Sequence, residues 1–326
     1  MVRGGKRFQT EIPTLEVSDL GYRVSDTFSL KGISLSLGRG DGLAVVGTNG
    51  AGKTTLIRLV AGLLEPSVGR IRICGTSPRS WSRASQHLGY VQQAKELPDG
   101  VSVRTYLQHQ LHLRRAAPER YGELVKRARL SDFETQEVRT LSGGNQRKLH
   151  IISAVAHQPD LLVLDEPTVG LDPTAQETVL NLLQELKREG VSIVFASHHR
   201  QELVALADSV AVLHQGRQIF DASLVDMLRG NETTTLNLEA FVRQETPALQ
   251  DWAAKLPGIT SLVEEAVPTD TGVSIKLVDP RYKQALAEIV IAANAAGLSL
   301  RSATVSTPSL ADVISQLIQR GRKEYS

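Results

Sequence analysis

The sequence predicts an α/β fold in which a parallel sheet with crossover helices is followed by a smaller α+β domain. Four-residue apolar runs at 43–46, 161–164 and 193–196 are typical of strands that are buried on both faces of a sheet. The last two runs flank a segment with helical spacing, and the order strand, helix, strand favours a parallel arrangement. The composition changes near 229–236, where a polar Gly-Asn-Glu-Thr-Thr-Thr segment indicates a domain boundary.

The first domain is predicted over residues 14–229, after a flexible polar leader at 1–13. Apolar and polar residues begin to alternate at Leu15 and do so again over 33–37, which is typical of strands with one buried face. We therefore expect at least two further strands before the first fully buried run.

Residues 102–130 have helical spacing of their apolar residues and many charges. We interpret this stretch as part of a helical subdomain, placed at about 94–158 and inserted into the sheet domain. Near the end of the domain, two short apolar stretches flank Gln215 and Gly216, which predicts a closing hairpin.

The second domain is predicted over 237–326 and has its own pattern. Apolar residues alternate over 273–277, which indicates a strand, and a helix over 281–296 and a strand over 298–305 follow. A final helix is expected from Thr307, because a proline follows it and the later apolar residues have helical spacing. These elements together indicate a small α+β domain.

The charge and aromatic content argue against a nucleic-acid partner. The 326 residues include 37 basic and 35 acidic side chains, so the net charge is only +2. Aromatic residues make up 4% of the chain, which leaves few platforms for base stacking. We therefore predict no nucleic-acid partner.

The single cysteine and the hydropathy limit the cellular context. Cys74 excludes a disulfide within the chain and fits a reducing compartment, and we interpret it as a small buried hydrophobe in a strand. A helix that spans a bilayer needs about 20 consecutive apolar residues. The best candidate, 289–300, is shorter and contains an asparagine and a glycine. A membrane-embedded part would therefore belong to another chain.

The segment Gly-Thr-Asn-Gly-Ala-Gly-Lys-Thr at 47–54 matches the P-loop pattern G-x-x-x-x-G-K-[ST]. It follows an apolar strand and precedes a helical stretch, so its backbone N–H groups and the helix N-terminus would bind phosphate oxygens. Lys53 would reach the β- and γ-phosphates, and Thr54 would hold Mg²⁺. The alternative is a glycine-rich turn that happens to contain a lysine. The predicted nucleotide-binding residues of this P-loop NTPase fold are Gly47, Asn49, Gly50, Gly52, Lys53, Thr54 and Thr55.

The buried strand at 161–164 ends in two acidic residues. Asp165 is predicted to lie near Mg²⁺, as the strand-end carboxylate of P-loop NTPases does. Glu166 would orient and polarise an attacking water. The alternative is a pair of exposed acids at a strand end, an interpretation that the P-loop weakens.

The segment Leu-Ser-Gly-Gly-Asn-Gln at 141–146 resembles the signature sequence of ABC ATPases. Ser142 is predicted to cap a helix that runs toward His157, and Gly143 and Gly144 would let the backbone approach a phosphate. In that family this surface contacts the γ-phosphate held by the other subunit. The resemblance therefore implies a head-to-tail homodimer of nucleotide-binding domains with two ATP molecules between them.

Four shorter motifs strengthen the resemblance, which covers about 15–228. Gln93 is assigned the Q-loop role, including a place at the metal, with Gln92 as the alternative. Asp172, after glycine and leucine, resembles the D-loop, and His198 resembles the histidine of the H-loop. Tyr22 precedes the P-loop at about the distance of the aromatic residue that stacks on adenine.

The complete motif set resembles the ATP-binding subunit of an ABC transporter. It implies Glu166, His198 and Gln93 as catalytic residues, with Thr54, Gln93 and Asp165 at the metal. A single nucleotide-binding domain without coiled coils favours a transporter over ABC ATPases that act on ribosomes or chromosomes. The resemblance implies an integral membrane permease as partner and a cytoplasmic position, peripheral on the inner face of the cell membrane.

The direction of transport depends on the C-terminal domain. Thr-Pro-Ser-Leu-Ala-Asp-Val at 307–313 resembles the extension of bacterial drug and polysaccharide exporter ATPases, which favours export. An ABC importer ATPase and a soluble ABC-type nucleotide switch are the alternatives. The tail is interpreted either as a regulatory domain or as one that serves dimerisation or stability.

Overall fold

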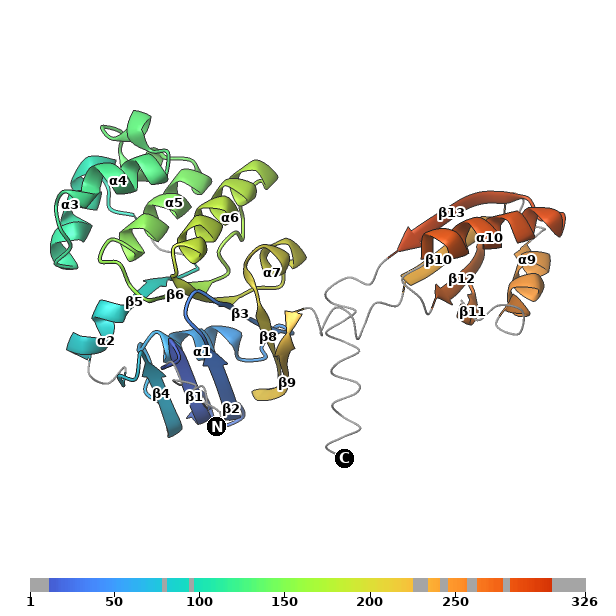
Figure 1. The fold of residues 1–326 in the computed structure, drawn as a ribbon, viewed down its shortest axis with the longest axis horizontal. Coiled ribbons are helices and arrows are strands. Elements are labelled where there is room, and N and C mark those ends of the chain that lie inside the picture. Colours follow the sequence, from blue (N-terminus) through green and yellow to red (C-terminus); the bar gives the residue numbers. More distant parts are fainter. Residues whose placement is uncertain are drawn as a thin grey trace, which may run out of the picture. The chain divides into compact units, whose positions relative to one another are not determined.

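The computed structural model describes residues 12–77, 81–93, 97–224, 234–240, 246–256, 263–277 and 282–306. The chain divides into two compact units, which separate between Val225 and Asp226 (Figure 1). The predicted leader up to residue 11, residues 229–233 of the predicted boundary and the helix predicted from Thr307 lie outside the described residues.

The first unit is built on a mixed sheet with the strand order β4-β1-β2-β9-β8-β3-β7-β6-β5 among the described residues. The strands β5, β6, β7, β3 and β8 are parallel neighbours, which confirms the predicted parallel arrangement, whereas β1, β2 and β4 pair antiparallel. The strands are β1 (Leu15–Arg23), β2 (Ser29–Leu37), β3 (Gly42–Gly47), β4 (Val68–Ile73), β5 (Leu88–Val91), β6 (Leu161–Asp165), β7 (Ser192–Ala196), β8 (Ser209–His214) and β9 (Arg217–Ser223).

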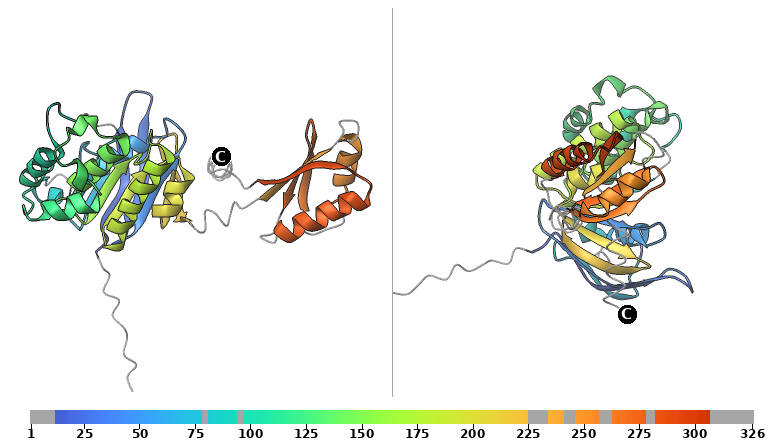
Figure 2. Two further views of the ribbon diagram at one scale, coloured as in Figure 1. Left: turned by 90° about the horizontal axis from the view of Figure 1, so that it is seen from above. Right: turned by 90° about the vertical axis from the view of Figure 1, so that its right-hand side faces the viewer.

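The predicted helical stretch over 102–130 contains two helices. The chain turns between them around Pro118, which cannot donate the backbone hydrogen bond that an uninterrupted helix would need. Both helices stand apart from β1, β2 and β4 in Figures 1 and 2. The helices of the first unit are α1 (Lys53–Val60), α2 (Trp81–His87), α3 (Val103–Leu113), α4 (Arg120–Arg127), α5 (Gly143–Ala154), α6 (Pro173–Arg188) and α7 (Arg200–Leu206).

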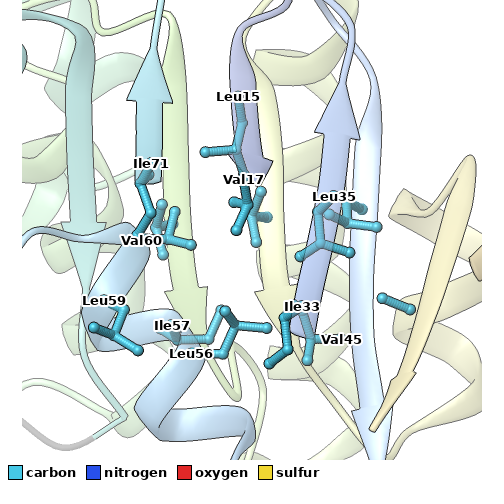
Figure 3. Packing of buried hydrophobic residues seen from close by; sticks show 14 of the residues in the cluster. Leu15, Val17, Ile33, Leu35, Val45, Leu56, Ile57, Leu59, Val60 and Ile71 are labelled. Carbon is cyan, nitrogen blue, oxygen red and sulfur yellow. The ribbon is translucent and has the colours of Figure 1, made fainter. Parts of the chain in front are cut away.

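The core of the first unit surrounds α1, as Figure 3 shows. Four consecutive or near-consecutive aliphatic side chains of α1 are fully buried, and each contributes about 2 kcal/mol through the apolar surface it removes from water. They face the antiparallel strands on one side and β3 on the other. This packing fixes the start of α1, where the P-loop ends. The labelled residues of the cluster are Leu15, Val17, Ile33, Leu35, Val45, Leu56, Ile57, Leu59, Val60 and Ile71.

The predicted closing hairpin is confirmed: β8 pairs antiparallel with β9. Its two turn residues, Gln215 and Gly216, both have positive φ, at 47° and 76°, as a two-residue turn of type I′ requires. A Cβ at Gly216 would lie 2.1 Å from the carbonyl oxygen of Ser29, so only glycine fits there.

The second unit is a four-stranded antiparallel sheet with two described helices. The strand order is β11-β12-β10-β13, and the core includes Leu236, Leu249, Ile275 and Ile289. The strand predicted at 273–277 and the following helix and strand are present, whereas β10, β11 and α9 were not predicted. The elements are β10 (Thr234–Ala240), α9 (Thr246–Ala253), β11 (Val263–Pro268), β12 (Gly272–Leu277), α10 (Tyr282–Ala295) and β13 (Leu300–Ser306).

The structure corrects the interpretation of Cys74. The residue is only half-buried and lies in the turn after β4, with a positive φ of 47°, rather than within the strand. The strand ends at Ile73 because the chain reverses there and forms a bridge to Thr76.

Among the described residues, no helix combines the length and the hydropathy that a bilayer span needs.

Candidate active site

The P-loop connects the end of β3 to the start of α1. Gly47 is buried, and a Cβ there would lie 2.3 Å from the carbonyl oxygen of Leu213 on the neighbouring strand. Gly50 and Gly52 have φ values of 77° and 104°, in the region that glycine adopts without strain. Asn49 and Gly50 are exposed, whereas Thr55 is half-buried in the first turn of α1. The loop therefore turns sharply and ends at the N-terminus of a helix, as an anion-binding loop does.

Lys53 is the first residue of α1, and its side chain turns back over the loop. Only 8% of the residue is exposed, and the ammonium group donates hydrogen bonds to the carbonyl oxygens of Gly47, at 3.0 Å, and Thr48, at 3.2 Å. Burial lowers the pKa of Lys53, and Glu166 and Asp165 oppose that change. The loop thus holds a positive charge inside its curve, where it can meet phosphate oxygens.

Thr54 and Asp165 form the candidate metal site. The hydroxyl of Thr54 donates a hydrogen bond of 3.3 Å to Oδ1 of Asp165, which ends β6 and is only 3% exposed. Burial raises the pKa of Asp165, and the hydrogen bond from Thr54 opposes this. A hydroxyl and a carboxylate oxygen are the ligand types that Mg²⁺ prefers, so these two residues fit the ion.

The three residues predicted to be catalytic meet at one carboxylate. His198 Nδ1 lies 3.3 Å from Oε1 of Glu166, and the side-chain amide of Gln93 donates a hydrogen bond of 3.2 Å to Oε2 of Glu166. Gln93 therefore contacts Glu166 rather than the Thr54–Asp165 pair. The alternative, Gln92, contributes a backbone carbonyl to another contact.

The backbone at the end of β6 and β7 sets the positions of Glu166 and His198. Glu166 has a positive φ of 47°, which is uncommon for a residue with a side chain and is typical of residues held for a function. Its N–H donates to the carbonyl oxygen of Ala196. The His198 ring lies 4.0 Å from the ring of His199, so the neighbouring histidine limits its rotation.

Arg147 is a residue that the motifs did not identify. It belongs to α5, is 7% exposed, and its guanidinium donates to backbone carbonyls on two separate loops. On one loop it bonds to Gln92 and Gln93, at 2.7 and 3.5 Å. On the other it bonds to the carbonyls of Asp165, Glu166 and Pro167, at 2.7–3.1 Å. Arg147 therefore joins the segment that carries Gln93 to the segment that carries Glu166.

Glu202 is a second residue that the motifs missed. It lies in α7, is almost fully buried, and accepts hydrogen bonds from the backbone N–H and the hydroxyl of Thr168. This contact anchors the segment after Glu166 to the helix that follows His198. Burial lowers the pKa of Arg147 to about 10, and the negative charge of Glu202 opposes that change.

The signature segment forms the N-terminus of α5. Ser142 caps the helix as predicted, because its Oγ accepts a hydrogen bond of 3.4 Å from the N–H of Asn145. The helix ends at Ala154, before His157. Gly144 is buried, and a Cβ there would lie 2.8 Å from Cβ of Ala175, so close packing against α6 also requires this glycine.

The remaining predicted nucleotide-binding residues lie on different elements. Gly143 is exposed beside Leu171, and Asp172 is exposed and caps α6, where its carboxylate accepts from the N–H of Ala175 at 3.0 Å. Tyr22 is half-buried near the end of β1 and packs against the core. Phe28 was not predicted, yet its ring approaches the P-loop: a Cβ at Gly52 would lie 3.4 Å from it.

Comparisons with known proteins agree with the family that the motifs resemble. A family model described as ABC transporter matches residues 30–169. The chain is 32% identical over 307 residues to the daunorubicin resistance ATP-binding protein DrrA3 of Streptomyces coeruleorubidus, covering 92% of this chain and 94% of that protein. It is 31% identical to the energy-coupling factor transporter ATP-binding protein EcfA of Methanothermobacter thermautotrophicus, and the match covers 67% of this chain and 73% of that protein. A solved structure of the ATP-binding subunit of an ABC transporter matches with a TM-score of 0.60 at 28% identity, covering 67% and 92%.

Proposed function

The chain belongs to the ATP-binding proteins of ABC transporters, and from that premise we propose that it powers export of a substrate through a separate membrane permease. As a member of this family it binds and hydrolyses ATP. The observation that best supports hydrolysis at this site is the meeting of Gln93 and His198 on Glu166, beside the Thr54–Asp165 pair.

ATP binding depends on the P-loop. Its backbone N–H groups and Lys53 bind the phosphates, and the buried ammonium exchanges its carbonyl partners for phosphate oxygens. Thr54 and Asp165 would hold Mg²⁺, which would supply positive charge beside the phosphates. Tyr22 lies near the end of β1 and Phe28 lies just before β2, and we assign adenine stacking to Tyr22.

Hydrolysis depends on the carboxylate of Glu166. Its two oxygens accept from Gln93 and contact His198, so both neighbours hold the carboxylate in one orientation. In that orientation Glu166 polarises a water that attacks the γ-phosphate, a contribution of about 10²–10⁴ in rate for a positioned general base. Arg147 maintains the arrangement because it joins both loops through their carbonyls.

A second copy of the chain completes the site. Ser142 and Gly143 are exposed at the N-terminus of a twelve-residue helix, where N–H groups and the helix dipole favour an anion. In the proposed head-to-tail dimer this surface, with Asp172, meets the phosphates bound by the other subunit. Closure of the dimer moves the Gln93 segment and the helical subdomain, which transmit the motion to the permease on the inner face of the cell membrane.

Export is favoured by the extent of the resemblance to DrrA3. A match that covers 92% of the chain extends well past Val225 into the second unit. The match to EcfA covers 67%, which the first unit alone can contain, and import is therefore the second candidate. The match to an ATPase named for drug resistance therefore includes the second unit as well as the first.

Reconstitution with a permease tests the direction of transport. The tagged chain is purified from membranes of its own cells, and a multi-span protein that copurifies is incorporated with it into vesicles, with the ATPase facing outward. Export predicts ATP-dependent accumulation of daunorubicin inside the vesicles, and Glu166→Gln abolishes it. ATP-dependent release of a trapped substrate from the vesicles would instead indicate import, and failure to copurify with any membrane protein would favour a soluble switch.

A further inference from the structure

We propose that Cys74, His87 and Asp160 form a binding site for a divalent transition-metal cation, with Zn²⁺ as the best match to the donor set. The three side chains each offer one ligand atom, and these atoms all lie within 4.8 Å of one another. They come from three separate places in the first unit: the turn after β4, the end of α2 and the residue before β6.

The site is distinct from the ATP site. Asp160 precedes the amino end of β6, whereas Asp165 is at the carboxyl end of the same strand. At about 3.3 Å per residue, the two carboxylates are separated by roughly 16 Å of strand. The thiol, imidazole and carboxylate therefore form a second cluster of ligand-type groups at the opposite end of the parallel strands.

Strand pairing brings two of the ligands together. β5 and β6 are parallel neighbours with Leu88 opposite Leu161, so the residues directly before the two strands, His87 and Asp160, lie side by side. His87 Nδ1 and Asp160 Oδ2 lie 2.6 Å apart. The juxtaposition is thus set by the core of the sheet rather than by mobile surface side chains.

Buried polar contacts fix the third ligand relative to the other two. The N–H of Cys74 donates to the carbonyl oxygen of Thr14 at 3.0 Å, and the N–H of Ser192 donates to the carbonyl oxygen of Asp160 at 2.9 Å. The hydroxyls of Thr14 and Ser192 lie 3.1 Å apart, and both residues are buried. The backbones of Cys74 and Asp160 are therefore joined through two buried residues, so the ligands are preorganised.

The position of Cys74 in its turn supports a role for the thiol. Cys74 and Gly75 both have positive φ, at 47° and 76°, and the turn they form favours Asn, Asp or Gly at its first central position. Cysteine has no such preference. The Cys74 side chain packs partly against the core, and this packing explains why a small apolar side chain lies there. It does not explain why an imidazole and a carboxylate lie beside the thiol.

The donor set has the chemistry that Zn²⁺ prefers. Zinc binds thiolate sulfur at about 2.3 Å and imidazole nitrogen or carboxylate oxygen at about 2.0–2.2 Å, usually in a tetrahedron. Tetrahedral ligand atoms at those bond lengths lie roughly 3.3–3.7 Å apart. The contact of 2.6 Å between His87 and Asp160 therefore opens by about 1 Å when the cation enters between them. Both side chains are 37% exposed, which leaves access for the ion and for a water as fourth ligand.

A bound cation would take the place of the protons that the ligand atoms of this cluster now share. The Cys74 thiol hydrogen-bonds to Asp160, and the positive charge of Arg39 lies nearby. Binding forms the sulfur–metal bond and releases the thiol proton to solvent. His87 binds through Nδ1 as the neutral imidazole, and the two negative ligands outweigh the charge of Arg39.

Cobalt titration of the full chain provides the test, with an affinity tag that contains no histidine and with no nucleotide present. We expect one equivalent of Co²⁺ to bind, with a thiolate-to-cobalt charge-transfer band and the visible bands of tetrahedral cobalt. One equivalent of Zn²⁺ should displace it. Absence of saturable Co²⁺ binding up to millimolar concentration would overturn the proposal.

Two variants test the proposed ligands, and a third is the control. Cys74→Ser should remove the charge-transfer band and weaken binding at least tenfold, and His87→Ala should weaken it to a similar extent. His109→Ala, on the exposed face of α3, is the matched control and should bind as the unchanged protein does. Zn²⁺ should also raise the Tm of the unchanged protein but not that of Cys74→Ser, while both hydrolyse ATP equally. A Cys74→Ser variant that binds Co²⁺ with undiminished affinity, or a loss of binding in His109→Ala, would refute the site.

Discussion

The P-loop (47–54) and the signature segment (141–146) are both glycine-rich starts of helices, yet their surroundings differ. Lys53 is buried and bonded to the loop carbonyls, and Thr54 is bonded to Asp165. Ser142, by contrast, is exposed and its described hydrogen bond is to the N–H of Asn145 in its own helix. The P-loop thus has its partners within the chain, whereas the signature segment presents its helix N-terminus outward. The difference fits the proposed dimer, in which the P-loop is complete within one chain and the signature segment meets a second copy.

The largest effect on ATP hydrolysis should come from a change beside the P-loop. Glu166→Gln keeps an acceptor for Gln93 but cannot act as a base, so ATP hydrolysis should fall by about 10³-fold while ATP binding is retained. Phosphate release and fluorescent-nucleotide binding measure the two properties. Glu177→Gln, an exposed change on α6, is the control and should leave both unaltered. Turnover close to normal in Glu166→Gln would contradict the role assigned to Glu166.

Arg147→Met tests whether the two loops depend on one buried side chain. The change leaves several carbonyls of the Gln93 and Glu166 segments without a donor, and should reduce the free energy of unfolding by about 3 kcal/mol. Urea unfolding measures this, and ATPase activity should fall as well. Arg147→Lys keeps the charge but not the fork of donors, so it should recover only part of the loss. Full activity and stability in Arg147→Met would show that the loops hold their positions independently.

Ser142→Arg tests the role of the signature segment. It should prevent ATP-driven dimers and lower ATPase activity by about 10²-fold, while the monomer binds ATP normally. Light scattering with ATP and the Glu166→Gln background detects the dimer. Ser102→Arg is the matched control, because Ser102 caps α3 as Ser142 caps α5 and its loss should cost about 1 kcal/mol without affecting dimers. Normal dimers in Ser142→Arg would remove the basis for the two-subunit site.

The smallest expected effect is on stability, because the charged carboxylate of Asp165 is buried. Burial raises the pKa of Asp165, so the folded protein holds this proton more tightly than the unfolded chain does. The contribution of Asp165 to the free energy of unfolding therefore increases as the pH falls through the raised pKa. At pH 7 the charged form is a penalty, and Asp165→Asn should have a higher Tm but no ATPase activity.

That gain in Tm should narrow as the pH is lowered from 7 through the raised pKa of Asp165. Scanning calorimetry at several pH values measures it. Asp132→Asn, an exposed change, should show no gain at any pH. A lower Tm for Asp165→Asn at pH 7 would mean that the charge stabilises the folded state through its partners.

The local patterns of the sequence were sufficient for the phosphate loop and for several elements. The P-loop, the capping role of Ser142 and the hairpin turn at Gln215 depend on residues within a few positions of one another. Such features are determined by backbone conformation and capping chemistry, which short segments specify. The strands β10 and β11 were missed because they are defined by pairing across the second unit, and the helix α9 was also missed.

Long-range contacts account for what the patterns did not reveal. Arg147 was missed because its acceptors are backbone carbonyls about 20 and 55 positions away, and a carbonyl has no sequence signature. Cys74 was interpreted as a strand residue because it directly follows alternating residues, yet the reversal of the chain placed it in a turn. Phe28 reached the P-loop only through the pairing of β2 with its neighbours.

The sequence by itself determined the α/β fold, the ATP chemistry and the membership of the ABC family, because ordered short motifs specify each of them. The tertiary structure alone decided that Gln93 and His198 share the carboxylate of Glu166, and that Arg147 holds their segments together. It also brought Cys74, His87 and Asp160 within ligand distance at the opposite end of the sheet. These contacts depend on strand order and register, which are set by packing between segments far apart in the chain.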